Sequence, residues 1–318
     1  MTAASAPGKI ILFGEHAVVS GVSALGGAID LRARVRLEDS PGKTLIEAKD
    51  LALQGFRLDL ITGQIVSADA VKATRYVSSV LSEYGAKDIT VKVDSDLPLA
   101  AGLGSSAAIV VATLAALNEH MGLGLSRKDL ASQAYKIEKA VQQGMGSPMD
   151  TALATFGGYL QVSRDISPLD LPQLDMVVGS TEQPHDTRCE VERVQGLLAQ
   201  HPDIVGPIFQ AIGAISSNAV ALLRDRRLKE LGELMNINHG LLEAVGVGTK
   251  ELSELVYAAR GAGEAFGAKI TGAGGGGCMI ALPSSEGSTR LIAALRQAGG
   301  RAFLVKTGCE GVRVVRDR

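Results

Sequence analysis

A loop of small residues that leads into a helix is the part of this sequence best suited to do chemistry. It reads Pro98-Leu-Ala-Ala-Gly102-Leu-Gly104-Ser105-Ser106-Ala107. Backbone N–H groups in such a loop can approach phosphate oxygens closely, and the N-terminus of the following helix adds a partial positive charge. Ser105 and Ser106 can add hydroxyls to a phosphate or a metal ion. The pattern predicts a phosphate site, and a tight turn with serine as the helix N-cap is the alternative.

Three other nucleotide-binding patterns occur in the sequence, but the residues or elements around each of them do not fit the motif. Gly42-Lys-Thr44 is no P-loop, because Leu37 stands where that motif needs its first glycine. Gly102-x-Gly104-x-x-Ala107 is a loose dinucleotide fingerprint, yet its helix leads into a second helix rather than into a parallel strand that ends in an acidic residue. The glycine run 272–277 opens a strand instead of a helix. The chain has no HRD or DFG triplet, which excludes the protein-kinase fold.

Three charged residues outside the loop have ordinary structural interpretations when they are taken alone. Lys9 could be an ordinary surface lysine. Glu138 is flanked by lysines and could be a solvated helix residue paired with one of them. Asp150 ends Ser147-Pro148-Met149-Asp150, which resembles an ordinary helix start with a serine N-cap and proline at the first helical position.

Alternating and helical patterns predict the elements that must position these residues. The expected elements of the first half are strands at 9–13, 31–38 and 89–93, and helices at 68–84, at 105–121 and from 126 onward. Gly122 ends the second helix. Ser126 and Asp129 resemble a capping box at the start of the third, and apolar residues follow them at helical spacing.

The second half is expected to form another α+β unit. Asp, Ser and Pro gather between Ser163 and Pro172, which indicates a domain boundary. The elements expected beyond it are a strand at 176–178, helices between 189 and 261, a strand at 278–282, a helix at 286–298 and a strand at 302–306. We therefore expect an α+β protein with domains at 1–165 and 166–318.

Composition indicates an ordinary globular enzyme. The 318 residues are 46% hydrophobic, enough for a full core. The 32 Lys and Arg nearly balance the 34 Asp and Glu, so we expect no basic surface for nucleic acid. The three cysteines, Cys189, Cys278 and Cys309, form no CxxC pair, which predicts a reducing compartment and no structural zinc.

Two segments bear on location. Residues 1–9 lack the basic and apolar regions of a signal peptide, so a cytoplasmic location is expected. No charged residue occurs between Leu97 and Leu117, a stretch long enough to span a bilayer. Glycine, proline and serine fill its first half. We therefore interpret it as a loop that feeds a buried core helix, and expect no membrane contact.

Three separated motifs together resemble those of the GHMP kinases, the superfamily of galactokinase, homoserine kinase, mevalonate kinase and phosphomevalonate kinase. They are Pro7-Gly-Lys9-Ile-Ile-Leu-Phe-Gly14-Glu15-His16-Ala-Val-Val19, the loop from Pro98 to Ala108, and Lys269-Ile-Thr271-Gly-Ala-Gly-Gly-Gly-Gly-Cys278. Their order and spacing are similar over nearly the whole chain. The resemblance implies a two-domain α+β fold, ribosomal-protein-S5-domain-2-like at the N-terminus and ferredoxin-like at the C-terminus, with the active site at the interface.

Within this superfamily the chain resembles the mevalonate kinase branch, of the archaeal or bacterial type. The resemblance lies in Gly14-Glu-His-Ala-Val-Val19 and in Met235-Asn-Ile-Asn238-His239-Gly-Leu-Leu. It implies phosphorylation of the 5-hydroxyl of (R)-mevalonate, with ATP and mevalonate as partners and Mg²⁺ as the metal. A homodimer is common among such relatives.

The resemblance also implies roles at the nucleotide end of the site. The residues expected to bind ATP are Pro98, Leu99, Ala100, Ala101, Gly102, Leu103, Gly104, Ser105, Ser106, Ala107 and Ala108. Ser106 and Glu138 would hold Mg²⁺, an ion that keeps several waters and needs few protein ligands. Asp150 would be the general base for the attacking hydroxyl, with Lys9 beside it as a second catalytic residue. This chain lacks the glycine that many relatives carry after the serine at position 147.

At the acceptor end the resemblance implies four substrate contacts. Glu15 and His16 would face the carboxylate and hydroxyls of the acceptor, His16 as a hydrogen-bond donor and Glu15 as an orienting residue, although a lone histidine is often a structural residue. Thr187 would also contact the acceptor, or else cap the following helix. Thr271 would lie near the substrate, and the loop 272–277 would close on the site unless its glycines serve only close backbone packing.

Other functions stay open. Phosphomevalonate or a sugar could replace mevalonate as the acceptor. The chain could be a non-catalytic nucleotide-binding sensor of the same fold, although the joint presence of Lys9, Ser106, Glu138 and Asp150 argues against that. A dinucleotide oxidoreductase would instead require tight binding of NAD.

Overall fold

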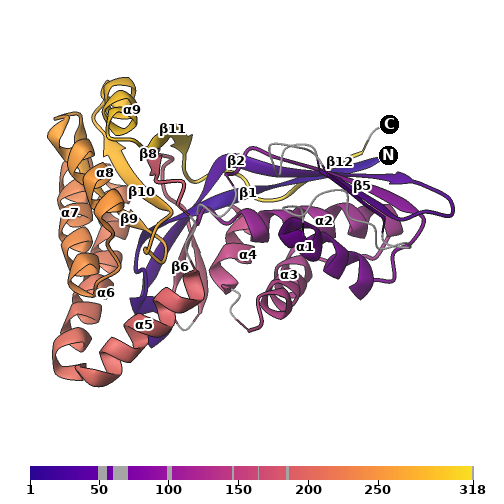
Figure 1. Cartoon of the computed structure of the whole chain (residues 1–318), viewed down its shortest axis with the longest axis horizontal. Coiled ribbons are helices and arrows are strands. Elements are labelled where there is room, and N and C mark those ends of the chain that lie inside the picture. The colour runs from indigo at the N-terminus through magenta and orange to yellow at the C-terminus, as the bar shows by residue number, and fades with distance from the viewer. Residues whose placement is uncertain are drawn as a thin grey trace.

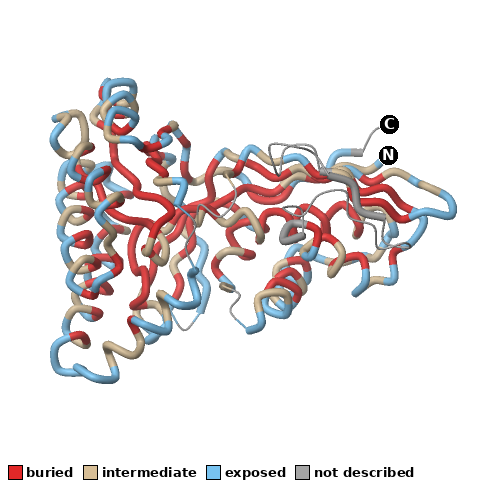
Figure 2. Tube along the Cα trace, viewed as in Figure 1, coloured by how far each residue is buried: buried red, intermediate tan, exposed pale blue. Residues whose placement is uncertain are grey.

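Two β-sheets, each covered by helices, make up the computed structural model of this chain (Figure 1). The structure describes residues 1–48, 56–59, 71–98, 102–144, 147–163, 165–183 and 186–316. Within these residues one sheet has eight strands and the other has four. Buried residues follow both sheets and the helix faces turned towards them (Figure 2).

The first sheet is built around two long antiparallel strands. Its strands are β1 (Thr2–Phe13), β2 (Ala24–Asp39), β3 (Leu45–Ala48), β4 (Phe56–Asp59), β5 (Ile89–Ser95), β6 (Tyr159–Val162), β7 (Ile166–Leu169) and β12 (Arg313–Arg316). The order is β12-β1-β2-β5-β3-β4, with β6 paired to β2 and β7 to β6. Only β3 and β5 pair in parallel among the described strands. The strands β1 and β2 run from this sheet towards the C-terminal helices (Figure 1).

Helices cover one face of the first sheet (Figure 1). They are α1 (Val71–Glu83), α2 (Ser105–Met121), α3 (Arg127–Val141) and α4 (Pro148–Phe156). Every residue of α2 from Ala107 to Leu117 is buried, which confirms the interpretation of this stretch as a core helix. The capping box of Ser126 and Asp129 at the start of α3 is also confirmed. The first three residues of the helix expected at 68–84 lie outside the described part.

The second sheet is antiparallel with the order β11-β8-β10-β9. Its strands are β8 (Asp175–Ser180), β9 (Ala265–Thr271), β10 (Cys278–Pro283) and β11 (Arg301–Lys306). The helices with it are α5 (Thr187–Gln200), α6 (Pro202–Arg224), α7 (Leu228–Ala244), α8 (Lys250–Gly261) and α9 (Ser288–Gln297). Strands and helical segments follow the β-α-β-β-α-β sequence of a ferredoxin-like unit, as expected.

The segment expected to be the domain boundary forms a strand of the first sheet. The segment 163–172 contains β7, which pairs with β6, and β12 at the C-terminal end pairs with β1. Backbone pairing therefore places two segments from beyond residue 165 on the N-terminal sheet. The division at 165 stays a prediction.

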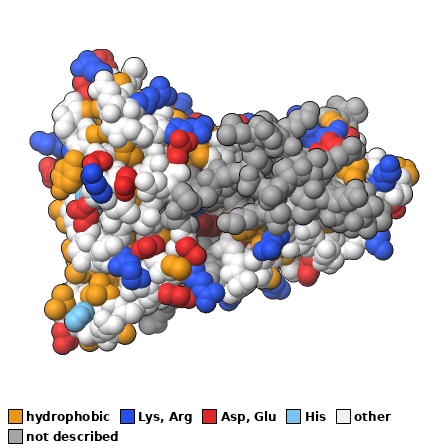
Figure 3. Space-filling model, in the orientation of Figure 1, with side chains coloured by type: hydrophobic (Ala, Val, Ile, Leu, Met, Phe, Trp, Pro, Cys, Tyr) orange, Lys and Arg blue, Asp and Glu red, His pale blue; other side chains and the backbone are white. Residues whose placement is uncertain are grey.

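Helix α6 is the one described helix long and apolar enough to cross a membrane. The core helices of soluble proteins have the same length and composition, and α6 packs against α7, β1 and β2. Acidic and basic side chains lie interspersed on the face shown in Figure 3.

Candidate active site

An irregularity in β1 places Lys9 against the end of the glycine-rich loop. The pairing of β1 with β2 shifts its register between Pro7 and Lys9, and such bulges often re-aim side chains next to active sites. The backbone N–H of Lys9 donates to the carbonyl of Leu103 at 2.8 Å. A Cβ on Gly104 would lie 2.8 Å from Cγ of Lys9, and Gly104 has a φ of 75°. Both the close approach and the left-handed backbone require glycine there.

The loop ends on α2 with N–H groups that have no helical partner. Gly104 is the N-cap and forms no side-chain cap, so the N–H groups of the first turn are available to an anion, together with the positive end of the helix dipole. The alternative of a serine N-cap is wrong, because Ser105 and Ser106 are the first two residues of the helix. Of the predicted ATP contacts, Leu99, Ala100 and Ala101 lie outside the described residues.

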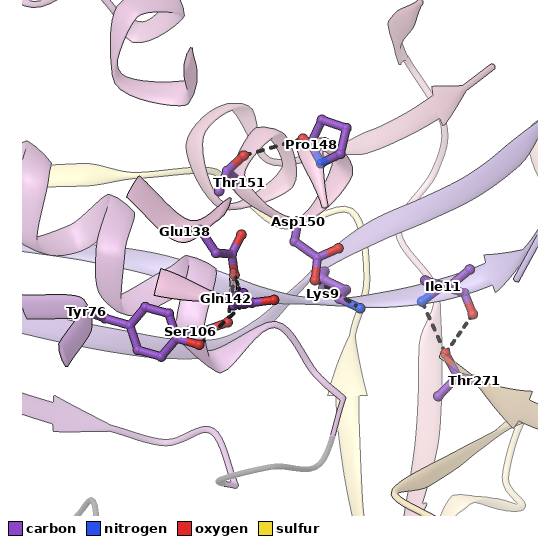
Figure 4. A network of polar contacts seen from close by, with 10 residues as sticks. All are labelled: Lys9, Ile11, Tyr76, Ser106, Glu138, Gln142, Pro148, Asp150, Thr151 and Thr271. Atoms are coloured by element: carbon purple, nitrogen blue, oxygen red, sulfur yellow. Dashed lines mark hydrogen bonds and ion pairs between the residues drawn. The ribbon is translucent and has the colours of Figure 1, made fainter. Parts of the chain in front are cut away.

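Ser106 and Glu138 meet between α2 and α3 (Figure 4). The Ser106 hydroxyl donates to Oε1 of Glu138 at 2.7 Å. Gln142, one turn further along α3, donates from Nε2 to the same oxygen at 3.1 Å and to the hydroxyl of Tyr76 at 3.3 Å. Two donors thus hold one carboxylate oxygen and leave the other free.

The free oxygen of Glu138 suits a cation. The side chain is 1% exposed, and Oε2 has no hydrogen-bond partner. Burial, followed by the negative charge of Asp150, raises the pKa of Glu138 to about 7. A bound cation would offset both effects. With the Ser106 hydroxyl beside it, this donor set fits Mg²⁺. No group of three His, Cys, Asp or Glu residues in the described ranges could hold a metal, so water and phosphate oxygens would complete the shell.

Asp150 lies beside Lys9 at the start of α4 (Figure 4). Oδ2 of Asp150 is 3.3 Å from Nζ of Lys9, and the two side chains are 17% and 8% exposed. The helix starts as the sequence predicted, with Ser147 as N-cap and Pro148 in the first turn. This carboxylate can accept a proton from a hydroxyl, while the ammonium can balance its charge. The pair and the Glu138 carboxylate are near enough to influence one another electrostatically.

Glu15 is buried against residues that come from far along the chain. It forms an ion pair with Lys269 of β9, and both side chains are fully buried. Asn238 of α7 donates from Nδ2 to Oε2 of Glu15 at 3.4 Å. Burial lowers the pKa of Lys269, while the Glu15 carboxylate opposes that shift.

His16 connects the end of β1 to the late glycine run. Its Nε2 lies 2.8 Å from the carbonyl oxygen of Ala273, and the imidazole is buried. Burial lowers the pKa of His16, whereas the hydrogen bond to Ala273 and the charge of Glu15 oppose that effect. A neutral imidazole that donates from Nε2 to this carbonyl leaves Nδ1, which is buried without a partner, as an acceptor.

Thr271 joins the two sheets. Its hydroxyl donates to the carbonyl of Ile11 at 2.8 Å and accepts from the N–H of Ile11 at 3.2 Å (Figure 4). The side chain thus clamps β9 to β1 two residues from Lys9.

Thr187 is exposed at the start of α5. Asp186 is the N-cap, and its Oδ1 accepts from the N–H groups of Arg188 at 2.9 Å and Cys189 at 3.2 Å. The interpretation of Thr187 as the cap is therefore wrong. Its contact with a substrate stays a prediction.

Sequence reasoning missed four polar residues that organise this site: Tyr76, Gln142, Asn238 and Lys269. Gln142 could have been found, because it follows Glu138 at helical spacing. Lys269 and Asn238 stand in two of the motifs that carry the resemblance, which could have marked them as residues of the site. Neither spacing nor composition indicates that Tyr76 or Asn238 reaches these partners.

Family models match two parts of the chain. The GHMP kinases N terminal domain matches residues 70–158, and the GHMP kinases C terminal domain matches residues 219–301. The first match covers the loop, Glu138 and Asp150.

Individual relatives extend the match over nearly all of the chain. It is 40% identical to the mevalonate kinase of Thermococcus sibiricus and 41% identical to that of Pyrococcus horikoshii, in each case over 98% of this chain and 97% of the relative. Among solved structures, L. major mevalonate kinase in complex with R-mevalonate has a TM-score of 0.84 at 25% identity, over 96% of both chains. Methanococcus jannaschii mevalonate kinase has a TM-score of 0.82 at 27% identity, over 96% of this chain and 98% of that one.

Proposed function

The chain belongs to the GHMP kinases, and from that premise we propose that it phosphorylates the 5-hydroxyl of (R)-mevalonate with ATP to give 5-phosphomevalonate. The observation that carries this proposal is the pairing of Lys9 with Asp150 at 3.3 Å, next to a helix N-terminus suited to phosphate. Phosphoryl transfer needs a positioned nucleophile and fixed positive charge more than covalent chemistry, and this arrangement offers both.

In the proposed reaction the oxygen of the acceptor hydroxyl forms a bond to the γ-phosphorus while the bond to the leaving ADP oxygen breaks. Asp150 accepts the hydroxyl proton. Lys9 stabilises the Asp150 carboxylate and can donate to the attacking oxygen or to the γ-phosphoryl oxygens. The N–H groups at the start of α2 bind phosphate oxygens.

Ser106 and Glu138 are the residues proposed to hold Mg²⁺. When bound, the ion neutralises charge that develops on the phosphate oxygens. The contribution of the chain is to orient Glu138: the hydrogen bonds from Ser106 and Gln142 fix Oε1 and leave Oε2 for the metal.

The acceptor is inferred from the relatives and from the residues at the end of β1. Proteins named mevalonate kinase match this chain over almost their entire length. We place the acceptor beside His16, Thr187, Thr271 and the loop 272–277, between proposed domains 1–165 and 166–318. The clamp of Thr271 on Ile11 supports that placement, because it joins the loop's strand to the strand of Lys9. We also propose a cytoplasmic location.

A coupled assay of ADP release with four acceptors tests the proposal. (R)-Mevalonate, phosphomevalonate, galactose and homoserine are compared with MgATP as the donor, and phosphorus NMR identifies the product. The proposal predicts turnover with mevalonate and a phosphate ester at the 5-position. Turnover with another acceptor and none with mevalonate would refute it.

A further inference from the structure

A buried ion pair joins the turn after β1 to strand β9. Nζ of Lys269 contacts Oε1 of Glu15 and also donates to the carbonyl of Ile270 at 2.6 Å. Asn238 donates to the other carboxylate oxygen of Glu15. Both oxygens of Glu15 are thus engaged inside the protein. The carboxylate is therefore placed to hold its surroundings, and its expected contact with the acceptor stays a prediction.

The turn anchored by Glu15 has a strained backbone. His16 has a φ of 59°, in the left-handed region, which a residue other than glycine keeps only where its surroundings enforce it. Glu15 fixes the turn on one side of His16. On the other side, the imidazole binds the carbonyl of Ala273. The turn is therefore held by two contacts, one with Lys269 of β9 and one with Ala273 of the loop that follows this strand.

Stability alone gives a poor account of this ion pair. Taking two charges out of water is costly, and apolar side chains of similar size often stabilise a core as well as a buried ion pair does. A buried pair does fix two elements relative to one another, because neither charge can move away without leaving the other unpaired. Here the two elements are the turn that carries His16 and the strand that leads into the loop 272–277.

We propose that Lys269 is a positioning residue for the acceptor side of the active site and acts through Glu15. The inference rests on the proposed function, because it takes His16 and the loop 272–277 as parts of the acceptor site. Lys269 holds Glu15, and Glu15 keeps His16 in its left-handed conformation. Separate contacts hold the nucleotide end, where Glu138 is bonded to Ser106 and Gln142. Loss of the ion pair should therefore weaken binding of the acceptor but not binding of the nucleotide.

The test begins with Lys269→Met, which keeps the length of the side chain and removes its charge. The KM for mevalonate should rise about tenfold or more, because a small displacement of a positioning group is enough to weaken binding that much. The Kd for MgATP should stay within about twofold of the wild-type value. Hydrogen–deuterium exchange should become faster in peptides that cover 12–18 and 271–278, but not in those that cover 102–110.

The double variant Lys269→Met with Glu15→Gln separates positioning from stability and serves if the single variant fails to fold. With no charge left buried, its melting temperature should return towards that of the wild type, while the KM for mevalonate stays high. The matched control is Lys250→Met, at a lysine whose side chain is 81% exposed and pairs loosely with Glu254. This control should match the wild type in kinetics and exchange.

The outcomes decide whether the ion pair positions the acceptor site or only stabilises the fold. If the double variant recovers the wild-type KM together with stability, the pair is structural and the proposal fails. Unchanged exchange and KM in a folded Lys269→Met variant would also overturn it. Failure of the proposed function is distinguishable, because it appears as lack of wild-type turnover with mevalonate, whereas the exchange experiment needs no acceptor.

Discussion

Nζ of Lys9 on β1 lies 3.3 Å from Oδ2 of Asp150 at the start of α4. The contact joins strand β1 of the first sheet to a helix that packs on it. A bulge at one end of the contact and a proline-initiated helix at the other set its geometry. Substitutions that disturb either partner should therefore affect catalysis before they affect the fold.

Gly104→Ala is expected to displace Lys9. The new Cβ would meet Cγ of Lys9 at 2.8 Å, in addition to the strain of a φ of 75°. Gly124→Ala is the matched control, because Gly124 has a φ of 70° and a Cβ added there would have no atom within 4 Å. Both variants should lose about 1–2 kcal/mol of unfolding free energy to the backbone strain.

Only Gly104→Ala should also lose kcat/KM, on the order of 100-fold, since misplaced catalytic groups have effects of this size. Urea unfolding and steady-state kinetics of the two variants make the comparison. Equal kcat/KM values would show that the contact of Gly104 with Lys9 has no catalytic consequence.

Glu138→Gln is expected to remove the dependence of nucleotide affinity on Mg²⁺. The amide keeps the size of the side chain but loses the charge that Oε2 would offer to the ion. Calorimetry measures the Kd for ATP with EDTA and with Mg²⁺. The ratio of the EDTA value to the Mg²⁺ value should be about tenfold or more lower in Glu138→Gln than in the wild type. Glu254→Gln, at a glutamate whose side chain is 54% exposed, is the control. A ratio that Glu138→Gln leaves intact would exclude Glu138 as a metal ligand.

The polar pairs of the site were harder to predict than the fold. The apolar run of α2 and the capping box of Ser126 are local patterns, and the structure has both. By contrast, Glu15 and Lys269 meet only because β9 packs beside the end of β1, and no local pattern encodes that approach. The edge strand β12 cannot be predicted from its sequence, Arg-Val-Val-Arg, because four residues are too few to show an alternating pattern.

His239 should make the stability of the protein depend on pH. Burial lowers its pKa to about 4, with Arg260 and Lys269 acting in the same direction and Glu243 opposing. In the unfolded chain the imidazole takes up a proton near its ordinary pKa of about 6.5. The contribution of neutral His239 is therefore complete above pH 6.5 and is lost as the pH falls towards 4.

Urea unfolding at pH 7.5 and 5.5 measures this effect. Between these values the wild type should lose about 1 kcal/mol more unfolding free energy than His239→Gln, which has no group to titrate there. Identical losses in the two proteins would show that His239 is not held neutral by its surroundings.

Single-turnover phosphoryl transfer to (R)-mevalonate shows whether Asp150 accepts the proton of the acceptor hydroxyl. Wild type, Asp150→Asn and Asp165→Asn are compared, the last altering an exposed aspartate between β6 and β7. We expect Asp150→Asn to bind MgATP normally and to transfer the phosphoryl group about 10²–10⁴-fold more slowly, while Asp165→Asn matches the wild type. An unchanged transfer rate in Asp150→Asn would exclude Asp150 as the general base.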